Sequence, residues 1–260
     1  MVTFNRNLMN KVGFELINDS WLSSVTRKQC FSLSSEKFTK EHMKTIIEEL
    51  NNNTFCTVKI EAGREDEVAI LIELGFRLIE TSLNFNKNLG VKSKGKEDRA
   101  KESSIEYIRK QERKRAVEII KISGNSFNHS RFFRDKHIKR KVQTIIKEEW
   151  VASYFKGERG TNLIVINENE RIVGFVLLCE KFNGSNTTTG IIDLIAVKSN
   201  SRGKGYGRSL IESAEFLGHK SGWTEIEIGT QTTNLPAMRL YNRCGYILDG
   251  SAYTLHYGTL

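Results

Sequence analysis

A short glycine-rich segment, RGKGYG at residues 202–207, restricts what this chain can fold into more than any other feature. It follows an apolar stretch, IIDLIAV at residues 191–197, and precedes a segment with the apolar spacing of an amphipathic helix. Glycines let successive backbone N–H groups turn toward one point, because no Cβ blocks the approach. The helix N-terminus adds partial positive charge at that point. The segment therefore predicts a cradle for a pyrophosphate group.

The glycine spacing separates this segment from two other phosphate-binding motifs. A Walker loop requires Ser or Thr after Gly-Lys, whereas Lys204 is followed by Gly205. The dinucleotide fingerprint requires G-x-G-x-x-G, and here the third glycine comes one residue early, at Gly207. What remains is R-x-x-G-x-G at a strand-to-helix junction.

A second segment, NLPAMRLYNRCGY at residues 234–246, makes the interpretation of the glycine-rich segment more specific. Asn234 fits a helix N-cap, and Pro236 is tolerated in the first turn of the helix that follows. Together, the two segments resemble the GNAT superfamily of N-acetyltransferases, which has strand, R-x-x-G-x-G, helix, strand, and then N-x-x-A-x-x-L-Y-x-x-x-G-[FY]. The second pattern matches at Asn234, Ala237, Leu240, Tyr241, Gly245 and Tyr246.

The resemblance implies that acetyl-CoA is the co-substrate and that no metal is needed. Backbone N–H groups at Ile195, Ala196 and Val197 would bind the pantetheine arm and polarise the thioester carbonyl. Tyr241 matches the tyrosine that protonates the leaving thiolate in this family, which makes it the candidate general acid. The other cofactor-binding residues implied are Arg202, Gly203, Lys204, Gly205, Tyr206, Gly207, Arg208, Asn234 and Ala237.

The apolar patterns predict two α/β units. Residues 105–260 read as the GNAT fold, an α/β (α+β) arrangement with a mixed central sheet flanked by helices. The predicted helices cover residues 105–123, a segment ending near 154, and residues 208–220 and 235–244, and the predicted strands cover 162–166, 172–180, 189–197, 223–229 and 246–257. A polar, charged linker at 89–104 precedes this domain.

Residues 1–88 read as a smaller α/β unit. It contains a helix that Thr39 caps, a strand over 54–60, a helix over 64–74 and a strand over 76–85. Both LGF at residues 74–76 and CGY at residues 244–246 join a helix to a strand through glycine and an aromatic residue. This echo is consistent with a truncated GNAT copy, although glycine also ends many unrelated helices.

The whole chain also resembles the bacterial dTDP-fucosamine acetyltransferase group, whose members acetylate an amino group on a nucleotide-linked dideoxy sugar. The segments that carry this likeness are LGFRLIET at 74–81, SRF at 130–132, WV at 150–151 and SAY at 251–253. The resemblance implies a role in surface polysaccharide biosynthesis and an N-terminal unit that helps to form the acceptor site. The charged linker and the basic N-terminal helices depart from the group, so the sugar and the nucleotide stay open.

Direct attack on the thioester requires a base, because a sugar amine is an ammonium at neutral pH. The resemblance places Glu80 near the acceptor amine, and Asp193 on the central strand is the alternative carboxylate. Arg131 is a candidate contact to phosphate or sugar. A Ser/His/Asp nucleophile arrangement is neither recognisable nor needed for direct transfer.

Charge and cysteine content limit the alternatives. The formal net charge of +9 suits a polyanionic partner, and a phosphate-bearing small molecule satisfies it as well as nucleic acid does. The four cysteines are scattered without metal or redox spacing, and neither a signal peptide nor a membrane span is recognisable, so we expect a cytoplasmic protein. A peptide α-amine as acceptor, and a non-catalytic acyl-CoA-binding module, are the competing hypotheses. A homodimer stays open.

Overall fold

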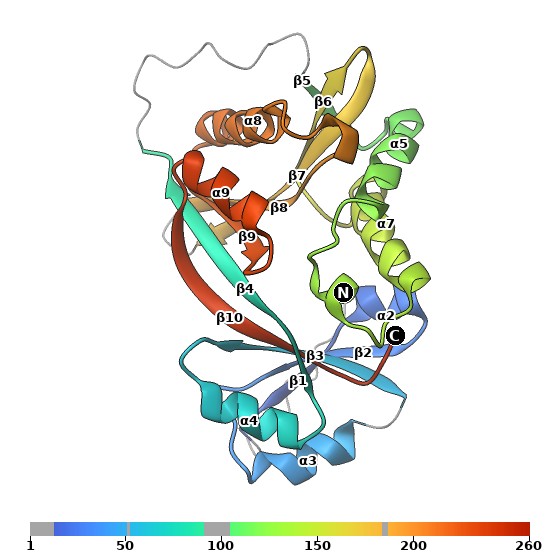
Figure 1. Ribbon diagram of the computed structural model, residues 1–260, viewed down its shortest axis with the longest axis vertical. Helices are drawn as coiled ribbons and strands as arrows, with labels where there is room; N and C mark the ends of the chain where they lie inside the picture. The colour runs from blue at the N-terminus through green and yellow to red at the C-terminus, as the bar shows by residue number, and fades with distance from the viewer. Residues whose placement is uncertain (1–12, 51–52, 91–104, 184–186) are drawn as a thin grey trace. The chain divides into compact units, whose positions relative to one another are not determined.

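The computed structural model describes residues 13–50, 53–90, 105–183 and 187–260. Contacts between residues divide the chain into two compact units (Figure 1). The first unit contains the described parts of residues 1–82, 131–142 and 250–260, and the second contains those of 83–130 and 143–249. Two long strands, β4 (Arg77–Asn88) and β10 (Ile247–Tyr257), have residues in both units.

The first unit is a sheet with helices. Its strands are hydrogen-bonded in the order β1-β2-β3-β10-β4, with β2 parallel to β3 and β10 antiparallel to β3. Besides β4 and β10, this unit contains β1 (Glu15–Asn18), β2 (Gln29–Ser34), β3 (Thr54–Glu61), α2 (Ser20–Thr26), α3 (His42–Glu49), α4 (Glu65–Glu73) and α6 (Arg131–Arg134). Asp19 begins α2 by accepting the Leu22 N–H at 2.9 Å.

Strand alternation gives this sheet one apolar face. Val58 and Ile60 of β3 and Leu255 of β10 are buried in a core that Ile46 of α3 and Leu71 of α4 complete. Figure 1 shows α3 and α4 together at this side of the strands. Residues in between, on the same strands, project to the opposite face, because side chains alternate along a strand.

The second unit has the strand order β4-β9-β8-β7-β6-β5 in the described residues. Its further strands are β5 (Ile105–Ile108), β6 (Asn162–Glu168), β7 (Arg171–Asn183), β8 (Thr187–Val197) and β9 (Trp223–Gln231). Its helices are α5 (Arg113–Gly124), α7 (Arg140–Lys156), α8 (Tyr206–Ser221), α9 (Leu235–Arg243) and the 3-10 turn η2 (Ser199–Ser201). β5 to β8 are antiparallel neighbours, and β8 runs parallel to β9.

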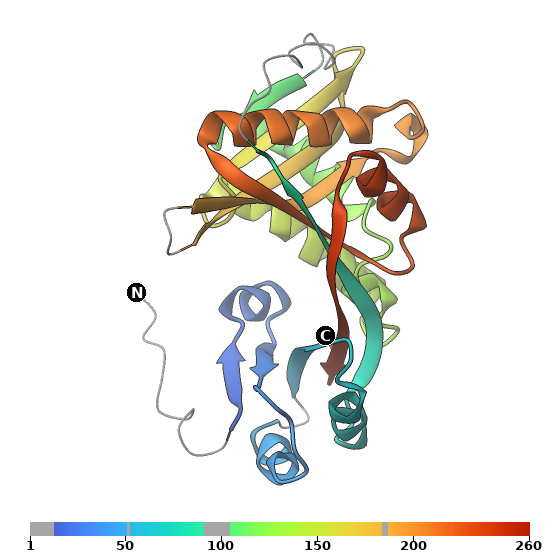
Figure 2. The ribbon, with the colours of Figure 1, turned by 90° about the vertical axis from the view of Figure 1, so that its left-hand side faces the viewer.

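Helices cover both faces of this second sheet (Figure 2). On one face, α8 and α9 contribute to a core with Ile192, Ile226 and Ile228. On the other face, α5 and α7 pack over Phe175 and Leu177. The mixed sheet flanked by helices is the predicted α/β GNAT fold, which the structure confirms.

The predicted helix over residues 105–123 was wrong at its start. Residues 105–108 form the edge strand β5, which pairs with β6, and the helix begins only at Arg113. The spacing of Ile105 and Ile108 is typical of a helix, but pairing with β6 makes this segment a strand. The sequence patterns predicted no helix or strand before Thr39, where the structure has β1, α2 and β2. The capping role of Thr39 is not seen, since Glu41 precedes α3 without a side-chain cap.

The structure divides the chain differently from the sequence-based boundaries. Residues 131–142 and 250–260 belong to the first unit, although both were expected within 105–260. Conversely, the end of β4 belongs to the second unit, where Leu83, Phe85 and Leu89 are buried in its core. A fragment covering 105–260 would lack these three side chains, so we expect it to be unstable. The linker predicted at 89–104 lies almost wholly outside the described residues.

Candidate functional site

The central strand of the second unit, β8, loses one neighbour before it ends. β8 and β9 pair in parallel only as far as Ile192 and Ile228, whereas β8 continues to Val197. On its other side, β8 stays paired with β7 along its whole length. β8 and β9 therefore separate beyond Ile192, and one edge of β8 is open to a ligand.

A β-bulge lies where the two strands separate. Leu178 of β7 pairs with Ile192, but the preceding Leu177 pairs with Leu194, which leaves Asp193 as an extra residue in β8. The bulge shifts the alternation of side chains: Ile192 belongs to the core beside α8, and Leu194 belongs to the core beside α7.

One hydrogen bond shows which way the backbone N–H groups point at the end of β8. Lys198 donates its N–H to a carbonyl of β7 at 2.8 Å. Because these directions alternate along a strand, the Ala196 N–H also faces β7, whereas those of Ile195 and Val197 face the separated edge. The Val197 carbonyl also points away from β7, because it accepts a hydrogen bond from Arg202 Nε at 3.1 Å. Of the three predicted residues, the structure thus turns Ile195 and Val197 toward the open edge, but not Ala196.

The glycine-rich segment forms the turn into α8. Gly203 and Gly205 have φ of 80° and 87°, a left-handed backbone that non-glycine residues rarely adopt. A Cβ at either position would meet no described atom within 4 Å, so the backbone there is open to an approaching group. Gly205 is the N-cap of α8, without a side-chain cap. The N–H groups of Tyr206 and Gly207, at the start of α8, can therefore bind an anion, whereas the Arg208 N–H donates to the Gly205 carbonyl at 3.0 Å.

Two side chains of this turn are held by a residue that the sequence analysis missed. Glu168, at the end of β6, accepts hydrogen bonds from Lys204 Nζ at 2.7 Å and from Tyr206 Oη at 2.9 Å. These bonds lower the pKa of the Glu168 carboxyl and raise the pKa of Lys204. Glu168 thus keeps Lys204 charged beside the glycines. No sequence signal could have found it, because 36 residues separate Glu168 from Lys204.

The second motif forms the start of α9 and the turn into β10. Asn234 caps α9: its side chain accepts the Ala237 N–H at 3.4 Å and donates to Thr230 Oγ1 at 3.0 Å. Asn234 and Ala237 therefore have a structural role in this ligand-free protein. Arg208, one turn into α8, is paired with Glu212 at 2.8 Å on the surface.

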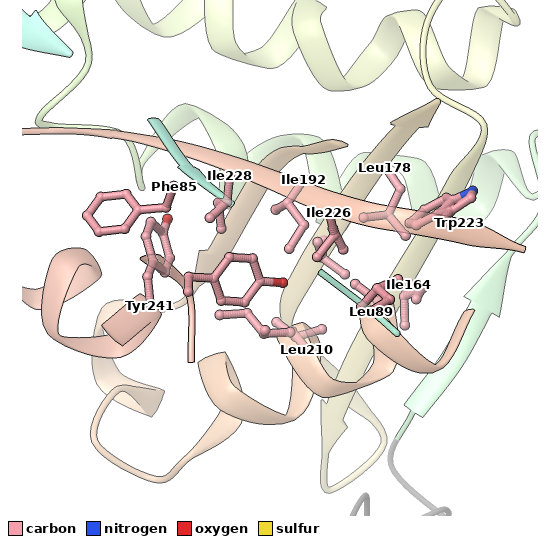
Figure 3. Packing of buried hydrophobic residues seen from close by; sticks show 14 of the residues in the cluster. Phe85, Leu89, Ile164, Leu178, Ile192, Leu210, Trp223, Ile226, Ile228 and Tyr241 are labelled. Carbon is pink, nitrogen blue, oxygen red and sulfur yellow. The ribbon is translucent and has the colours of Figure 1, made fainter. Parts of the chain in front are cut away.

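Tyr241 lies on the inner face of α9 and is 3% exposed. Figure 3 shows its ring directed from α9 toward Phe85 and Ile228, and the Phe85 ring meets it edge-on at 5.7 Å. Ile228 is the last residue of β9 that pairs with β8, so the phenol lies in the core next to the point of separation. Burial raises the pKa of Tyr241, which keeps the phenol protonated. Such a group can donate a proton.

The other two predicted site residues, Glu80 and Arg131, belong to the first unit, with β4 and α6 respectively. They lie close enough to interact: the negative charge of Glu80 counteracts the lowering of the Arg131 pKa that burial causes. The structure thus brings Ile195, Val197, the glycine-rich turn and Tyr241 together in the second unit. It brings Glu80 and Arg131 together in the first.

Asp193, the alternative base, is engaged by neighbouring side chains. Arg159 donates to both carboxylate oxygens, at 2.7 and 2.6 Å, and Trp150 donates its indole N–H at 2.8 Å. The carboxylate is 10% exposed. With three donors on its two oxygens, this carboxylate has little room for an acceptor amine. Instead, these contacts tie the bulge of β8 to α7 and to the loop that follows α7.

Replacing Arg159 with methionine is expected to destabilise the protein by about 1–3 kcal/mol, because Asp193 loses its bidentate partner while it stays largely buried. The value lies below that for a fully buried pair because the Arg159 side chain is 40% exposed. The midpoint of urea unfolding measures the change. Lys156→Met is the matched control: it removes a cation from the exposed pair with Glu149 and should cost no more than about 1 kcal/mol. Equal shifts for the two variants would contradict a structural role for the Arg159–Asp193 pair.

The comparison with protein families agrees with this geometry. The model of the Acetyltransferase (GNAT) family matches residues 128–246, which include the end of β8, the glycine-rich turn and α9. Residues 128–246 are thus similar to the GNAT acetyltransferases. The separated strands and the turn into α8 thus lie inside the matched segment, and Glu80 lies outside it.

Two curated relatives are similar to parts of the chain. The chain is 32% identical over 142 residues to the spore coat polysaccharide biosynthesis protein SpsD of Bacillus subtilis, covering 53% of this chain and 46% of that protein. It is 42% identical over 59 residues to a streptothricin acetyltransferase of Escherichia coli, covering 23% of this chain and 34% of that enzyme. The chain thus spans less than half the length of these two relatives.

Solved GNAT structures share the fold across most of the chain. A GCN5-related N-acetyltransferase from Sphaerobacter thermophilus matches with a TM-score of 0.57 and 13% identity, over 94% of this chain and 75% of that one. A tandem GNAT protein from the clavulanic acid biosynthesis pathway matches with a TM-score of 0.54 and 10% identity, over 88% and 74%. At these identities, the likeness concerns the fold alone.

Among the residues that the structure describes, no helix is both long enough and apolar enough to cross a membrane. Nor do the described residues include a group of three or more His, Cys, Asp or Glu side chains that could hold a metal ion. The four cysteines are free thiols, and burial raises the pKa of each.

Proposed function

We propose that this chain transfers an acetyl group from acetyl-CoA to the amino group of a nucleotide-linked amino-dideoxy sugar. The observation that carries the proposal is the combination of the separated β8 edge with the open glycine turn at the start of α8. This combination offers N–H donors for the pantetheine arm and for the pyrophosphate of coenzyme A. The name of the SpsD relative, a polysaccharide biosynthesis protein, favours a sugar acceptor.

The residues that would hold acetyl-CoA fit its chemistry. When bound, acetyl-CoA supplies a thioester carbonyl that an amine can attack directly. The backbone N–H groups of Ile195 and Val197 would bind the pantetheine arm along the open edge of β8. The N–H groups of residues 203–207, with the charge of Lys204, would bind the pyrophosphate. The positive φ of Gly203 and Gly205 is what brings that backbone within reach.

Proton transfers complete the proposed mechanism. Tyr241 would give its proton to the thiolate sulfur, which leaves more easily when protonated. Its raised pKa ensures that the proton is present at neutral pH. Glu80 would take the proton of the acceptor ammonium, directly or through one water molecule, before the amine attacks.

The test is an acetyl-transfer assay with the full chain. The protein is incubated with acetyl-CoA and a panel of acceptors, and the released CoA thiol is measured. The panel contains dTDP- and UDP-linked amino sugars, the free amino sugars, and a peptide with a free α-amine. Thiol release only with the nucleotide-linked sugars is the expected result. Release only with the peptide would replace the acceptor class, and binding of acetyl-CoA without any release would support a non-catalytic module.

Replacing Glu80 with glutamine should leave acetyl-CoA binding unchanged and lower kcat/KM by about 10-fold at neutral pH, because an amide cannot accept the ammonium proton. The rise of kcat/KM on the acidic side of the pH profile should shift with it, since that limb reports the essential base. The control is Glu61→Gln, which removes an exposed carboxylate from β3 in the same unit. A pH profile of Glu80→Gln that matches the wild type would exclude Glu80 as the base.

A further inference from the structure

The sheet of the first unit has a second face that carries buried polar side chains. Tyr253, Leu255 and Tyr257 of β10 belong to the apolar core of this unit, so Thr254 and His256 between them project to the opposite face. The antiparallel register with β3 places Thr254 opposite Lys59, and His256 opposite Thr57. Thr254 and His256 are both 0% exposed. This arrangement buries polar groups where an apolar pair would pack more easily.

His256 has a defined protonation state. Its Nδ1 lies 2.9 Å from Oδ2 of Asp135, a carboxylate that also accepts hydrogen bonds from Arg77 Nη2 and from the His137 N–H. These partners outweigh burial and lower the pKa of Asp135, so the carboxylate is ionised and Nδ1 must be the donor. Burial lowers the pKa of His256 to about 4 despite this hydrogen bond. His256 is therefore neutral, and its Nε2 carries a lone pair.

Two neighbouring polar atoms on this face have no partner. The structure gives no hydrogen bond to His256 Nε2 or to Thr254 Oγ1, although both atoms are buried. The Phe55 ring lies edge-on to the imidazole at 4.9 Å, and the Phe132 ring lies 6.1 Å from it. Buried polar atoms in native proteins nearly always have a partner, so two unpartnered atoms at positions i and i+2 indicate a missing polar group.

Two cations lie beside these atoms. The Arg131 guanidinium lies 4.7 Å from the centre of the Phe132 ring. Its charge contributes to lowering the pKa of His256, after burial, so the two side chains are close. Burial and the charge of Arg131 also lower the pKa of Lys59. The negative charge of Glu80 partly offsets both cations, and that of Asp19 also partly offsets Arg131.

We propose that this polar face of the first unit binds the acceptor as a hydroxylated phosphate ester, and that the His256–Asp135 pair and Thr254 read its hydroxyl or amino groups. Arg131 and Lys59 bind the phosphates, because the two cations lie close enough together to influence each other. His256 accepts a hydrogen bond at Nε2, and Asp135 fixes the tautomer that makes this possible. The inference rests on the proposed function only in identifying this ligand as the acetyl acceptor.

The experiment measures binding to the full chain by calorimetry without acetyl-CoA. The probes are dTDP-glucose, UDP-glucose and the sugar-free diphosphates dTDP and UDP. We expect one nucleotide sugar to bind, and Arg131→Gln to weaken both it and its diphosphate at least 10-fold. His256→Phe keeps a ring of similar size but removes the acceptor, and it should weaken the nucleotide sugar about 10-fold while the diphosphate changes little.

Two further variants keep the proposal testable. Thr254→Val is nearly isosteric and removes a hydroxyl that has no partner, so it should fold as well as the wild type and still weaken the nucleotide sugar. Arg134→Gln, an exposed residue of α6, is the control and should bind like the wild type. If His256→Phe fails to fold, the affinities of Thr254→Val and Arg131→Gln test the proposed site.

The outcomes separate this site from the proposed activity. Binding of no probe, or unchanged affinity in Arg131→Gln and Thr254→Val, would overturn the site. Variant-sensitive binding of a nucleotide sugar by a protein that acetylates none of the panel would support the site and overturn only the proposed function. Acetylation of a nucleotide amino sugar with unchanged KM in the variants would leave the function standing and remove the site.

Discussion

Replacing Tyr241 with phenylalanine is expected to lower kcat about 100-fold and to change the Kd for acetyl-CoA by less than about twofold. The substitution removes one hydroxyl and keeps the ring that packs against Phe85. Burial raises the pKa of this phenol, so the proton that it would give to the thiolate is held at every pH near neutrality. Steady-state kinetics with the acceptor that the wild type acetylates gives kcat, and calorimetry of acetyl-CoA binding gives the Kd.

Tyr246→Phe is the matched control for this experiment. Tyr246 lies in the same core, is 3% exposed like Tyr241, and its ring centre lies 6.3 Å from that of Tyr241. Its hydroxyl lies near Glu215 and has no part in the proposed proton transfer, so its removal should leave kcat close to wild type. If Tyr241→Phe turned over at the wild-type rate, water or another group would protonate the thiolate. Equal losses in both variants would indicate damage to the core instead.

The second large effect concerns Gly205, whose replacement by glutamate should abolish the thermal stabilisation that acetyl-CoA gives to the wild type. Gly205 begins α8 with φ of 87° and with open space where a Cβ would stand. A side chain there would occupy the space of the pyrophosphate, and its carboxylate would repel it at the helix N-terminus. The expected loss in affinity is at least about 100-fold, equivalent to about 2.7 kcal/mol. Thermal unfolding at increasing acetyl-CoA concentration measures it.

Gly222→Glu separates loss of binding from backbone strain. Gly222 ends the same helix with φ of 75°, and a Cβ there would also meet open space. Both substitutions force a non-glycine residue into the left-handed region, at a similar cost of about 1 kcal/mol. Only the Gly205 variant should lose the response to acetyl-CoA. A folded Gly205→Glu protein with the full thermal shift would show that the pyrophosphate is not bound at this turn.

The comparison of Ile105 with Gly205 shows which parts of the sequence are informative. The conformation at Gly205 depends on neighbouring residues alone: glycine permits the left-handed turn, and the amphipathic segment after it forms α8. The conformation at Ile105 depends on a partner 61 residues away, because Ile105 pairs with Ile166 of β6. Local patterns therefore predicted the turn into α8, whereas they misplaced the start of α5.

The GNAT fold of the second unit, the glycine turn, the N-cap Asn234 and the place of Tyr241 on α9 could be predicted from the sequence, because they depend on local backbone preferences and on the order of two motifs. The point where β8 leaves β9 could not be predicted, because the bulge at Asp193 depends on pairing with β7 and on donors from Trp150 and Arg159. The tertiary structure likewise brought His256 to Asp135, 121 residues earlier in the chain. Contacts between distant segments cannot be read from local periodicity, since burial and pairing select them only when the chain is folded.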